Sequence, residues 1–359
     1  MADLNELRGE INSLDEQIVR LLNQRAAAAV EIGKLKQTHG SAVFAPDREH
    51  EILKRITDCS AGPLSKASLL AIYRELMSAS FALERPPRVG YLGPNGSFSH
   101  EAAIAKFGTS VEYEPLADVR GVFDEMTRGH LDYGIVPIEN KTGGSVLDAL
   151  DAFIDHDVTI CNEVHLAIHH NLLANCRLEE IETVYSKPEV FTQCRRWLAE
   201  TGFGERIQTA PSTSRAAEMA AASHRGAAIG GALAAKLYEL QVMFANIEDD
   251  PQNTTRFVVL GGDSARPTGS DRTSVMFATA HRAGALVEVL LVFQRAGVNM
   301  TMITSRPSGK ADAEYHFFVD MDGHADEEPM KKALAEAREL CRPLRVLGSY
   351  PKATEVIAA

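Results

Sequence analysis

The chain has 359 residues, of which 45% are hydrophobic, so it is long enough for two or three domains with substantial cores. Its formal net charge of −12 is opposite in sign to that of general nucleic-acid and anionic-membrane binders, so we expect neither kind of partner. An acidic chain can bind small anions only in locally basic pockets, and such pockets are the features to look for.

Residues 3–84 are predicted to form three helices. Leucine and isoleucine recur every three or four residues along the first helix, which should end near Lys36. A second helix should begin near Pro46 and a third at Ser65. One long and two shorter helices leave an apolar stripe that a single chain does not bury, so we expect a homodimer.

Basic side chains on the first helix suggest a pocket for a small dianion. Arg25 and Lys36 share one helix face about 16 Å apart, so their long side chains can converge. Arg8 lies about 25 Å before Arg25 along the axis, so it can join them only from a second chain. The alternative is that these charges form a solvated helix face.

The helical segment resembles chorismate mutases of the all-helical, intertwined-dimer type. The resemblance covers residues 4–84 and rests on LRGEINSLDEQI, NQRAAAAVEIGKLK, PDREHEIL and the spacing of Ser80 and Glu84. It implies that Arg8 from a partner chain, Arg25 and Lys36 hold the carboxylates and the ether oxygen of the substrate. The remaining catalytic residues that it implies are Arg48, Glu49 for the ring hydroxyl, Ser80 and Glu84.

Chorismate rearranges to prephenate in one intramolecular pericyclic step, so positioning and preorganised cations suffice. Two residues depart from the family pattern. Ala45 stands where a charged residue often helps to hold the ring hydroxyl, which leaves that role to Glu49. Glu84 stands where many relatives carry Gln, and a glutamate donates a hydrogen bond only when it is protonated. An alternative hypothesis is therefore a dimerisation module that has lost mutase activity.

Beyond the linker Arg85-Pro86-Pro87, predicted strands alternate with helices, which indicates an α/β fold with a mostly parallel sheet and room for two lobes. Helix N-termini with free N–H groups bind anions, and several polar loops lie at such positions. These loops are GYLGPNGSFSHEA (90–102), DYGIVPIENKTGGSV (132–146), PSTSRAAEMAA (211–221) and QNTTRFVVL (252–260). Together they predict a cleft for a polar, anionic ligand, although helix capping is the alternative for each hydroxyl.

This segment resembles prephenate dehydratase across nearly all of residues 88–262, with the GPxGS, VPIEN, STxxAA-like and TRF patterns in the family's order. The resemblance implies a two-lobed fold like that of periplasmic binding proteins, with the active site between the lobes. It gives the essential role to Thr255, as hydrogen-bond donor to the leaving hydroxyl, and a substrate carboxylate to Arg256. The other substrate-binding candidates are Ser97, Glu139, Asn140, Ser212, Thr213 and Phe257. The adjacent His169 and His170 could supply an acid, but we expect a structural pair.

After a second linker, residues 261–270, the order strand, helix, strand, strand, helix, strand predicts a ferredoxin-like domain. The segment AGALVEVLLVFQRAGVNMTMITSRP (283–307) resembles ACT ligand-sensing domains. The resemblance implies phenylalanine as the effector, although Thr304 stands where the family often has Glu. The residues that it assigns to phenylalanine are Gly284, Ala285, Leu286, Ser305, Arg306 and Pro307. The alternative is a purely structural turn.

The resemblances together predict three domains: a chorismate mutase (1–86), a prephenate dehydratase (87–265) and an ACT regulatory domain (271–350). They imply a bifunctional isomerase and carbon–oxygen lyase of phenylalanine biosynthesis, acting on chorismate and prephenate and inhibited by phenylalanine. A non-catalytic, amino-acid-responsive binding module is the competing hypothesis. No signal peptide, bilayer-spanning run, CxxC pair or histidine cluster is visible, so we expect a cytoplasmic protein without membrane, metal ion or cofactor.

Overall fold

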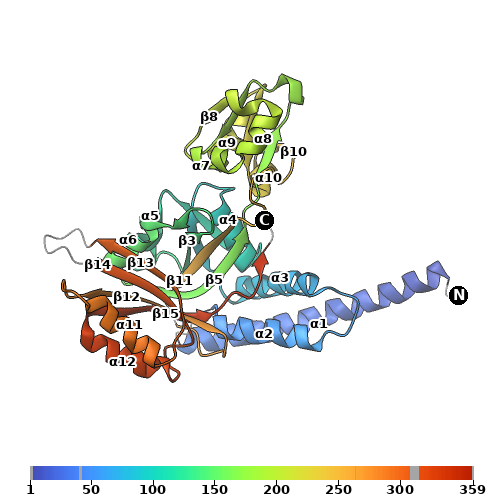
Figure 1. Cartoon of the computed structure of the whole chain (residues 1–359). Helices are drawn as coiled ribbons and strands as arrows, with labels where there is room; N and C mark the ends of the chain where they lie inside the picture. Colours follow the sequence, from blue (N-terminus) through green and yellow to red (C-terminus); the bar gives the residue numbers. More distant parts are fainter. Residues whose placement is uncertain (1–2, 40–42, 263, 308–314, 358–359) are drawn as a thin grey trace.

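The computed structural model describes residues 3–39, 43–262, 264–307 and 315–357. Figure 1 shows three parts that follow one another along the sequence: a group of helices, a two-lobed α/β part and a C-terminal part of strands and helices. The N-terminus lies at the free end of the first helix, away from the other parts (Figure 1).

The helical part is built as its sequence pattern predicts. Its three helices are α1 (Leu4–His39), α2 (Pro46–Cys59) and α3 (Lys66–Glu84). α1 contacts α3 through its second half, and its first half projects beyond the rest of the chain (Figure 1). Apolar residues on the projecting half are 46% to 64% exposed, namely Leu4, Leu7, Ile11, Leu14, Ile18 and Leu21. The apolar stripe therefore has no cover among the described residues of a single chain.

The first lobe of the α/β part is a seven-stranded mixed sheet. Its strands are β1 (Arg88–Leu92), β2 (Glu112–Leu116), β3 (Tyr133–Asn140), β4 (Gly144–Ser145), β5 (Thr159–Ala167), β11 (Thr254–Gly261) and β16 (Val356–Ile357). The order is β16-β5-β11-β3-β1-β2, with β4 paired to β3. Helices α4 (Phe98–Phe107), α5 (Val119–Thr127) and α6 (Leu147–Asp155) pack against it.

The prediction of a mostly parallel sheet is wrong for this lobe. β1 is parallel to β2 and β3, but β11 runs antiparallel to both of its neighbours, β3 and β5. The reason is connectivity: β11 re-enters the lobe from the second lobe, without the crossover helix that would make it parallel.

The second lobe is a five-stranded sheet with the order β10-β6-β9-β7-β8. Its strands are β6 (Asn171–Ala174), β7 (Thr183–Ser186), β8 (Ile207–Thr209), β9 (Gly226–Gly230) and β10 (Gln241–Phe244), and its helices are α7 (Pro188–Gln193), α8 (Arg195–Thr201), α9 (Thr213–Ala221) and α10 (Ala232–Leu237). The chain crosses between the lobes twice, and the crossings are joined by the Ile168 N–H to the Asn253 carbonyl oxygen, at 2.9 Å. The start of β11 therefore lies at the junction of the two lobes.

The C-terminal part has the predicted order of strands and helices. Its elements are β12 (Asp271–Thr279), α11 (Ala285–Arg295), β13 (Met300–Pro307), β14 (Tyr315–Asp322), α12 (Met330–Leu340) and β15 (Cys341–Pro351), with the sheet order β13-β14-β12-β15. One face of this sheet packs on the first lobe, where Met276, Phe318 and Leu347 share a core with Phe153 and Val258. The chain then returns to the first lobe, where β16 pairs with β5.

Candidate active sites

Four of the expected mutase residues meet where α1 passes α3. Arg25 Nη1 donates to Ser80 Oγ at 2.6 Å. Lys36 Nζ lies 3.1 Å from Glu84 Oε2 and donates to the carbonyl oxygen of Val43 at 2.7 Å. Two cations, a hydroxyl and a carboxylate therefore lie together where α1 passes α3.

Gly33 allows α1 and α3 to approach closely beside Glu84. A Cβ atom at position 33 would lie 2.8 Å from Glu84 Cγ and 3.1 Å from its Cα. Any larger residue would force the helices apart, so this glycine sets the position of the Glu84 carboxylate.

The other three expected mutase residues have different surroundings. Glu49 is only 8% exposed and forms an ion pair with Lys106 of α4, which belongs to the next part of the chain. Arg48 pairs with Glu51 at 2.5 Å, and both side chains are more than half exposed. Arg8 is exposed on the projecting half of α1. Arg48 and Arg8 therefore lie in solvent in this single chain, away from the side chains that meet between α1 and α3.

The expected dehydratase residue Thr255 lies at the junction of the lobes, beside Asn140. The Asn140 amide nitrogen donates to Thr255 Oγ1 at 2.8 Å and to Asn253 Oδ1 at 3.0 Å. The amide oxygen accepts from the backbone N–H groups of Thr142 (3.1 Å) and Gly143 (2.8 Å), which defines the orientation of the amide. Because Thr255 accepts from Asn140, its own hydroxyl hydrogen is available to another acceptor.

Three further candidate hydroxyls lie at the starts of helices. Ser97 Oγ accepts from the His100 N–H at 3.3 Å, at the start of α4. Ser212 Oγ accepts from the Arg215 N–H at 3.0 Å, at the start of α9, and Thr213 beside it is buried. The two serines thus cap helices, which was the alternative for them, and substrate binding by these residues stays a prediction.

Several polar residues that sequence reasoning missed lie where the two lobes meet. Gln193 Nε2 of α7 donates to Thr142 Oγ1 at 3.1 Å, and Ser214 Oγ of α9 donates to the carbonyl oxygen of Asn95. Glu101 Oε2 is buried without a hydrogen-bond partner in the part of the chain that is described, and burial raises the pKa of its carboxyl to about 7. All but Gln193 lie within the motifs already quoted, so a closer reading of those motifs could have found them.

His169 and His170, which we expected to be structural, each contact one polar side chain, and His170 Nδ1 is buried without a hydrogen-bond partner among the described residues. His169 Nδ1 lies 2.7 Å from Glu248 Oε1, and His170 Nε2 lies 2.8 Å from Gln193 Oε1. Burial lowers the pKa of the His170 imidazole below its usual range.

Arg256 does not lie with Thr255. Successive side chains of a strand point to opposite faces, and Arg256 is directed toward the C-terminal part. Its guanidinium donates to Glu163 at 2.8 Å, to Tyr350 Oη at 3.0 Å and to Asp320. With these partners the Arg256 guanidinium is not available to a substrate carboxylate between the lobes. The predicted role of Arg256 as a substrate anchor requires the guanidinium to break these contacts.

Two more residues expected at the cleft also lie elsewhere. Phe257 is 1% exposed and packs in the core of the first lobe, so no substrate reaches it in this conformation. Glu139 Oε2 lies 3.6 Å from Arg256 Nη1, on the side of the strand that faces the C-terminal part.

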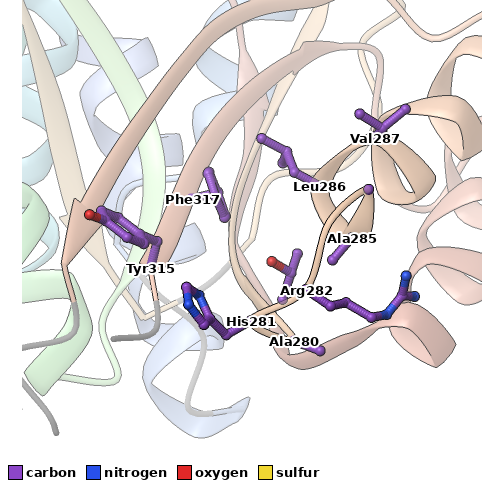
Figure 2. Close-up of a pocket in the computed structure, with 10 residues that line it drawn as sticks. Ala280, His281, Arg282, Ala285, Leu286, Val287, Tyr315 and Phe317 are labelled. Atoms are coloured by element: carbon purple, nitrogen blue, oxygen red, sulfur yellow. The ribbon is translucent and has the colours of Figure 1, made fainter. Parts of the chain in front are cut away.

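A pocket of about 200 Å³ opens in the C-terminal part beside the start of α11. Figure 2 shows Leu286, Tyr315 and Phe317 around the hollow, with His281 and Arg282 on the loop that borders it. The predicted residues Gly284, Ala285 and Leu286 line this pocket. Apolar side chains beside a charged loop suit a small amphiphilic molecule such as an amino acid.

The second half of the expected effector site lies on the strand beside this pocket, where Ser305 pairs with Phe317 and Pro307 with Tyr315. Ser305, Arg306 and Pro307 are on β13 and do not line it. Arg306 Nε instead donates to Asp151 Oδ1 of α6 at 2.7 Å, which ties β13 to the first lobe. The first effector motif therefore lines the pocket, and the second lies on the neighbouring strand without lining it.

Within residues 3–39, 43–262, 264–307 and 315–357, no cluster of three or more His, Cys, Asp or Glu side chains could hold a metal ion. Over the same ranges, none of the helices combines the length and the apolar character that crossing a membrane requires.

Two cations beside a hydroxyl and a carboxylate, polar side chains at the junction of two lobes and a separate amino-acid-sized pocket fit a multidomain enzyme for small anions with a sensing domain. Family models agree part by part: chorismate mutase type II matches residues 7–85, prephenate dehydratase residues 89–265 and the ACT domain residues 273–339.

Whole-chain relatives agree as well. The bifunctional chorismate mutase/prephenate dehydratase of Aquifex aeolicus is 42% identical over 98% of this chain and 99% of its own length. The Pseudomonas aeruginosa protein of the same name is 40% identical over 98% of this chain and 100% of its own length. The chain belongs to the family of bifunctional chorismate mutase/prephenate dehydratases, so it is an enzyme with both activities.

Among solved structures, a prephenate dehydratase from Arthrobacter aurescens in complex with L-Phe is similar to this chain. It is 30% identical, with a TM-score of 0.69, and the match covers 74% of this chain and 90% of that one.

Proposed function

We propose that residues 1–86 rearrange chorismate to prephenate, that residues 87–265 convert prephenate to phenylpyruvate, and that residues 271–350 bind phenylalanine and restrain the second step. Two facing chains complete the first site. This proposal assigns each reaction to its own side chains and gives the C-terminal pocket a ligand.

In the mutase step, the two carboxylates of chorismate bind cations of the helical part. Arg25 and Lys36 supply two of them, and Arg8 of a second chain supplies the third, because it lies about 25 Å from Arg25 along the same helix. The exposed apolar stripe on α1 supports this dimer, since a helix of this kind needs a partner face. Glu49 accepts the ring hydroxyl, and Glu84 approaches the ether oxygen.

In the dehydratase step, the ring of prephenate loses hydroxide and carbon dioxide together and becomes aromatic. The C–C bond between the ring and the carboxylate breaks, and its electron pair forms the new ring double bond. The hydroxide leaves with the electron pair of its own C–O bond. The Thr255 hydroxyl donates a hydrogen bond to the departing oxygen, and Asn140 orients that hydroxyl. The observation that carries this role is the 2.8 Å bond from the Asn140 amide to Thr255 Oγ1.

Replacing Thr255 by alanine tests this assignment. Loss of one preorganised donor should lower phenylpyruvate formation by about 10²- to 10³-fold, whereas chorismate consumption should stay near the wild-type rate. Thr255→Ser should retain activity because it keeps the hydroxyl, and Thr254→Ala is the matched control on the adjacent residue. A folded Thr255→Ala protein that still makes phenylpyruvate at the wild-type rate would remove Thr255 from the mechanism.

The same assay separates the competing hypotheses. A dimerisation module without mutase activity would leave chorismate unchanged while prephenate is consumed. A non-catalytic binding module would leave both substrates unchanged, without any added cofactor or metal ion.

Phenylalanine is the proposed effector of the C-terminal pocket. The pocket combines apolar side chains with a charged loop, and the Arthrobacter relative is a complex with L-Phe. Arg306 reaches α6 of the first lobe through Asp151, so a ligand that engages β13 would compete with a contact between the two domains. Binding and inhibition would then be linked through that contact.

A further inference from the structure

The helical domain and the dehydratase domain share a core, because residues 43–45, just before α2, pack into the first lobe. Phe44 is 3% exposed and lies in the aromatic core of the first lobe. Its ring contacts Phe107 of α4 (5.2 Å between centroids) and Tyr133 of β3 (5.5 Å), and its backbone N–H donates to the Tyr133 hydroxyl at 3.1 Å.

This anchored loop also carries parts of the proposed mutase site. Val43, one residue before Phe44, accepts the hydrogen bond from Lys36. Glu49 lies one helical turn after Ala45, to which its backbone N–H is bonded at 3.0 Å. The position of both mutase residues therefore depends on a segment that is held by the dehydratase domain.

A second contact reaches Glu49 directly. Lys106 of α4 pairs with Glu49 Oε2, and the two side chains are only 12% and 9% exposed. Lys106 Nζ also lies 5.3 Å from the centre of the Phe44 ring, which is within the range of a cation–π contact. Among the residues that the structure describes, Glu49 makes no other side-chain hydrogen bond, so its Oε1 is left for a ligand.

We propose that Lys106, a residue of the dehydratase domain, is a positioning residue of the mutase site. It holds the Glu49 carboxylate through one oxygen, so that the other oxygen accepts the ring hydroxyl of chorismate. A carboxylate this deeply buried is stable only when paired, and without Lys106 it would have to turn toward water and away from the substrate. This inference rests on the proposed role of Glu49, and it makes the mutase site a product of both domains.

The experiment compares Lys106→Met and Lys106→Arg in the full-length chain, with Lys66→Met as the matched control. Lys66 also forms an ion pair between parts of the chain, with Glu355, but that pair is exposed. Lys106→Met should lower mutase kcat/KM by about 10- to 100-fold, with phenylpyruvate formation from prephenate unchanged. Lys106→Arg should restore most of the activity, because it keeps the charge. If Lys106→Met does not fold, Lys106→Gln, which removes the charge but keeps N–H donors, takes its place, and a smaller loss of mutase kcat/KM is expected.

A substrate analogue distinguishes positioning from general structural damage. With a chorismate analogue whose ring hydroxyl is replaced by hydrogen, Lys106→Met should rearrange as fast as the wild type. An equal loss on chorismate and on the analogue, or no loss on chorismate, would overturn the role of Lys106.

The proposed role of Glu49 is tested separately by Glu49→Gln. If Glu49→Gln is as active as the wild type, the proposed mutase site itself is wrong. If Glu49→Gln loses activity while Lys106→Met keeps it, only the present inference fails. In the Glu49→Gln background, Lys106→Met should cause no further loss, because its effect acts through Glu49.

Discussion

Replacing Glu163 by glutamine should weaken the packing of the C-terminal domain on the first lobe. The side chain lies on β5 and is fully buried. Its Oε2 accepts from Arg256 Nε at 2.8 Å and from Arg272 of β12, and its Oε1 accepts from the Ala353 N–H at 3.0 Å. One carboxylate thus joins the first lobe, the C-terminal sheet and the returning tail.

The size of the effect follows from the pKa of Glu163. Burial alone would raise this pKa, but His165, Arg256 and Arg272 together lower it from 4.5 to about 2. His165 Nε2 is 3.8 Å away, beyond hydrogen-bond distance, so the two arginines are the closer partners. A shift of this size corresponds to about 3 kcal/mol in favour of the folded state. Because the pKa is lower in the folded protein, this stability is present above pH 4.5 and is lost as the pH falls through 2.

Calorimetric melting at several pH values measures this contribution. Glu163→Gln should lower the melting temperature of the dehydratase and C-terminal unit by about 6–12 °C at pH 7, and by progressively less below pH 4. Glu114→Gln is the matched control, since its pair with Arg88 is nearly half exposed, and it should shift melting by less than about 2 °C. A shift for Glu163→Gln that is no larger than the control's, or that is the same at pH 7 and pH 3, would refute the reasoning.

Three further predictions concern the proposed sites. Mixing Arg8→Ala with Arg25→Ala subunits should recover up to about a quarter of the mutase activity, because half of the statistically formed dimers have one intact site; no recovery after verified subunit exchange would count against a shared site. Glu84→Gln should raise mutase activity by roughly tenfold at neutral to alkaline pH. An amide can donate a hydrogen bond to the ether oxygen at every pH, whereas a carboxylate paired with Lys36 only accepts. An unchanged pH–rate profile would exclude a donor role for residue 84. Arg306→Ala should weaken inhibition by phenylalanine at least about fivefold while phenylpyruvate formation persists, and an unaltered inhibition constant would contradict this.

The fold could be predicted where the signal is local. The helices of the first domain and the βαββαβ order of the last follow from apolar spacing and turn residues, which lie close together in sequence. The sequences of strands β2 and β5 lack a clear pattern of this kind. β2 reads Glu-Tyr-Glu-Pro-Leu and is held by its pairing with β1, and β5 has the buried polar residues Asn162 and Glu163 at its centre. Both depend on distant partners that no short window contains.

The candidate sites, like the fold, could be predicted only where the signal is local in sequence. Arg25, Lys36, Ser80 and Glu84 meet because a helical repeat determines which side chains share a face. In the Thr255-Arg256-Phe257 motif, adjacent letters suggest a shared role, but a strand directs adjacent side chains to opposite faces.

The partners of the charged residues lie much further away in sequence. Glu163 and Asp320 are 93 and 64 residues from Arg256, and Lys106 is 57 residues from Glu49. A buried charge that binds a substrate and a buried charge that joins two domains need the same residue types, because each must be paired to be stable. Sequence alone therefore assigns both to ligands, and only the three-dimensional arrangement separates Arg256, which joins two domains, from Arg25, which contacts Ser80 within the helical part.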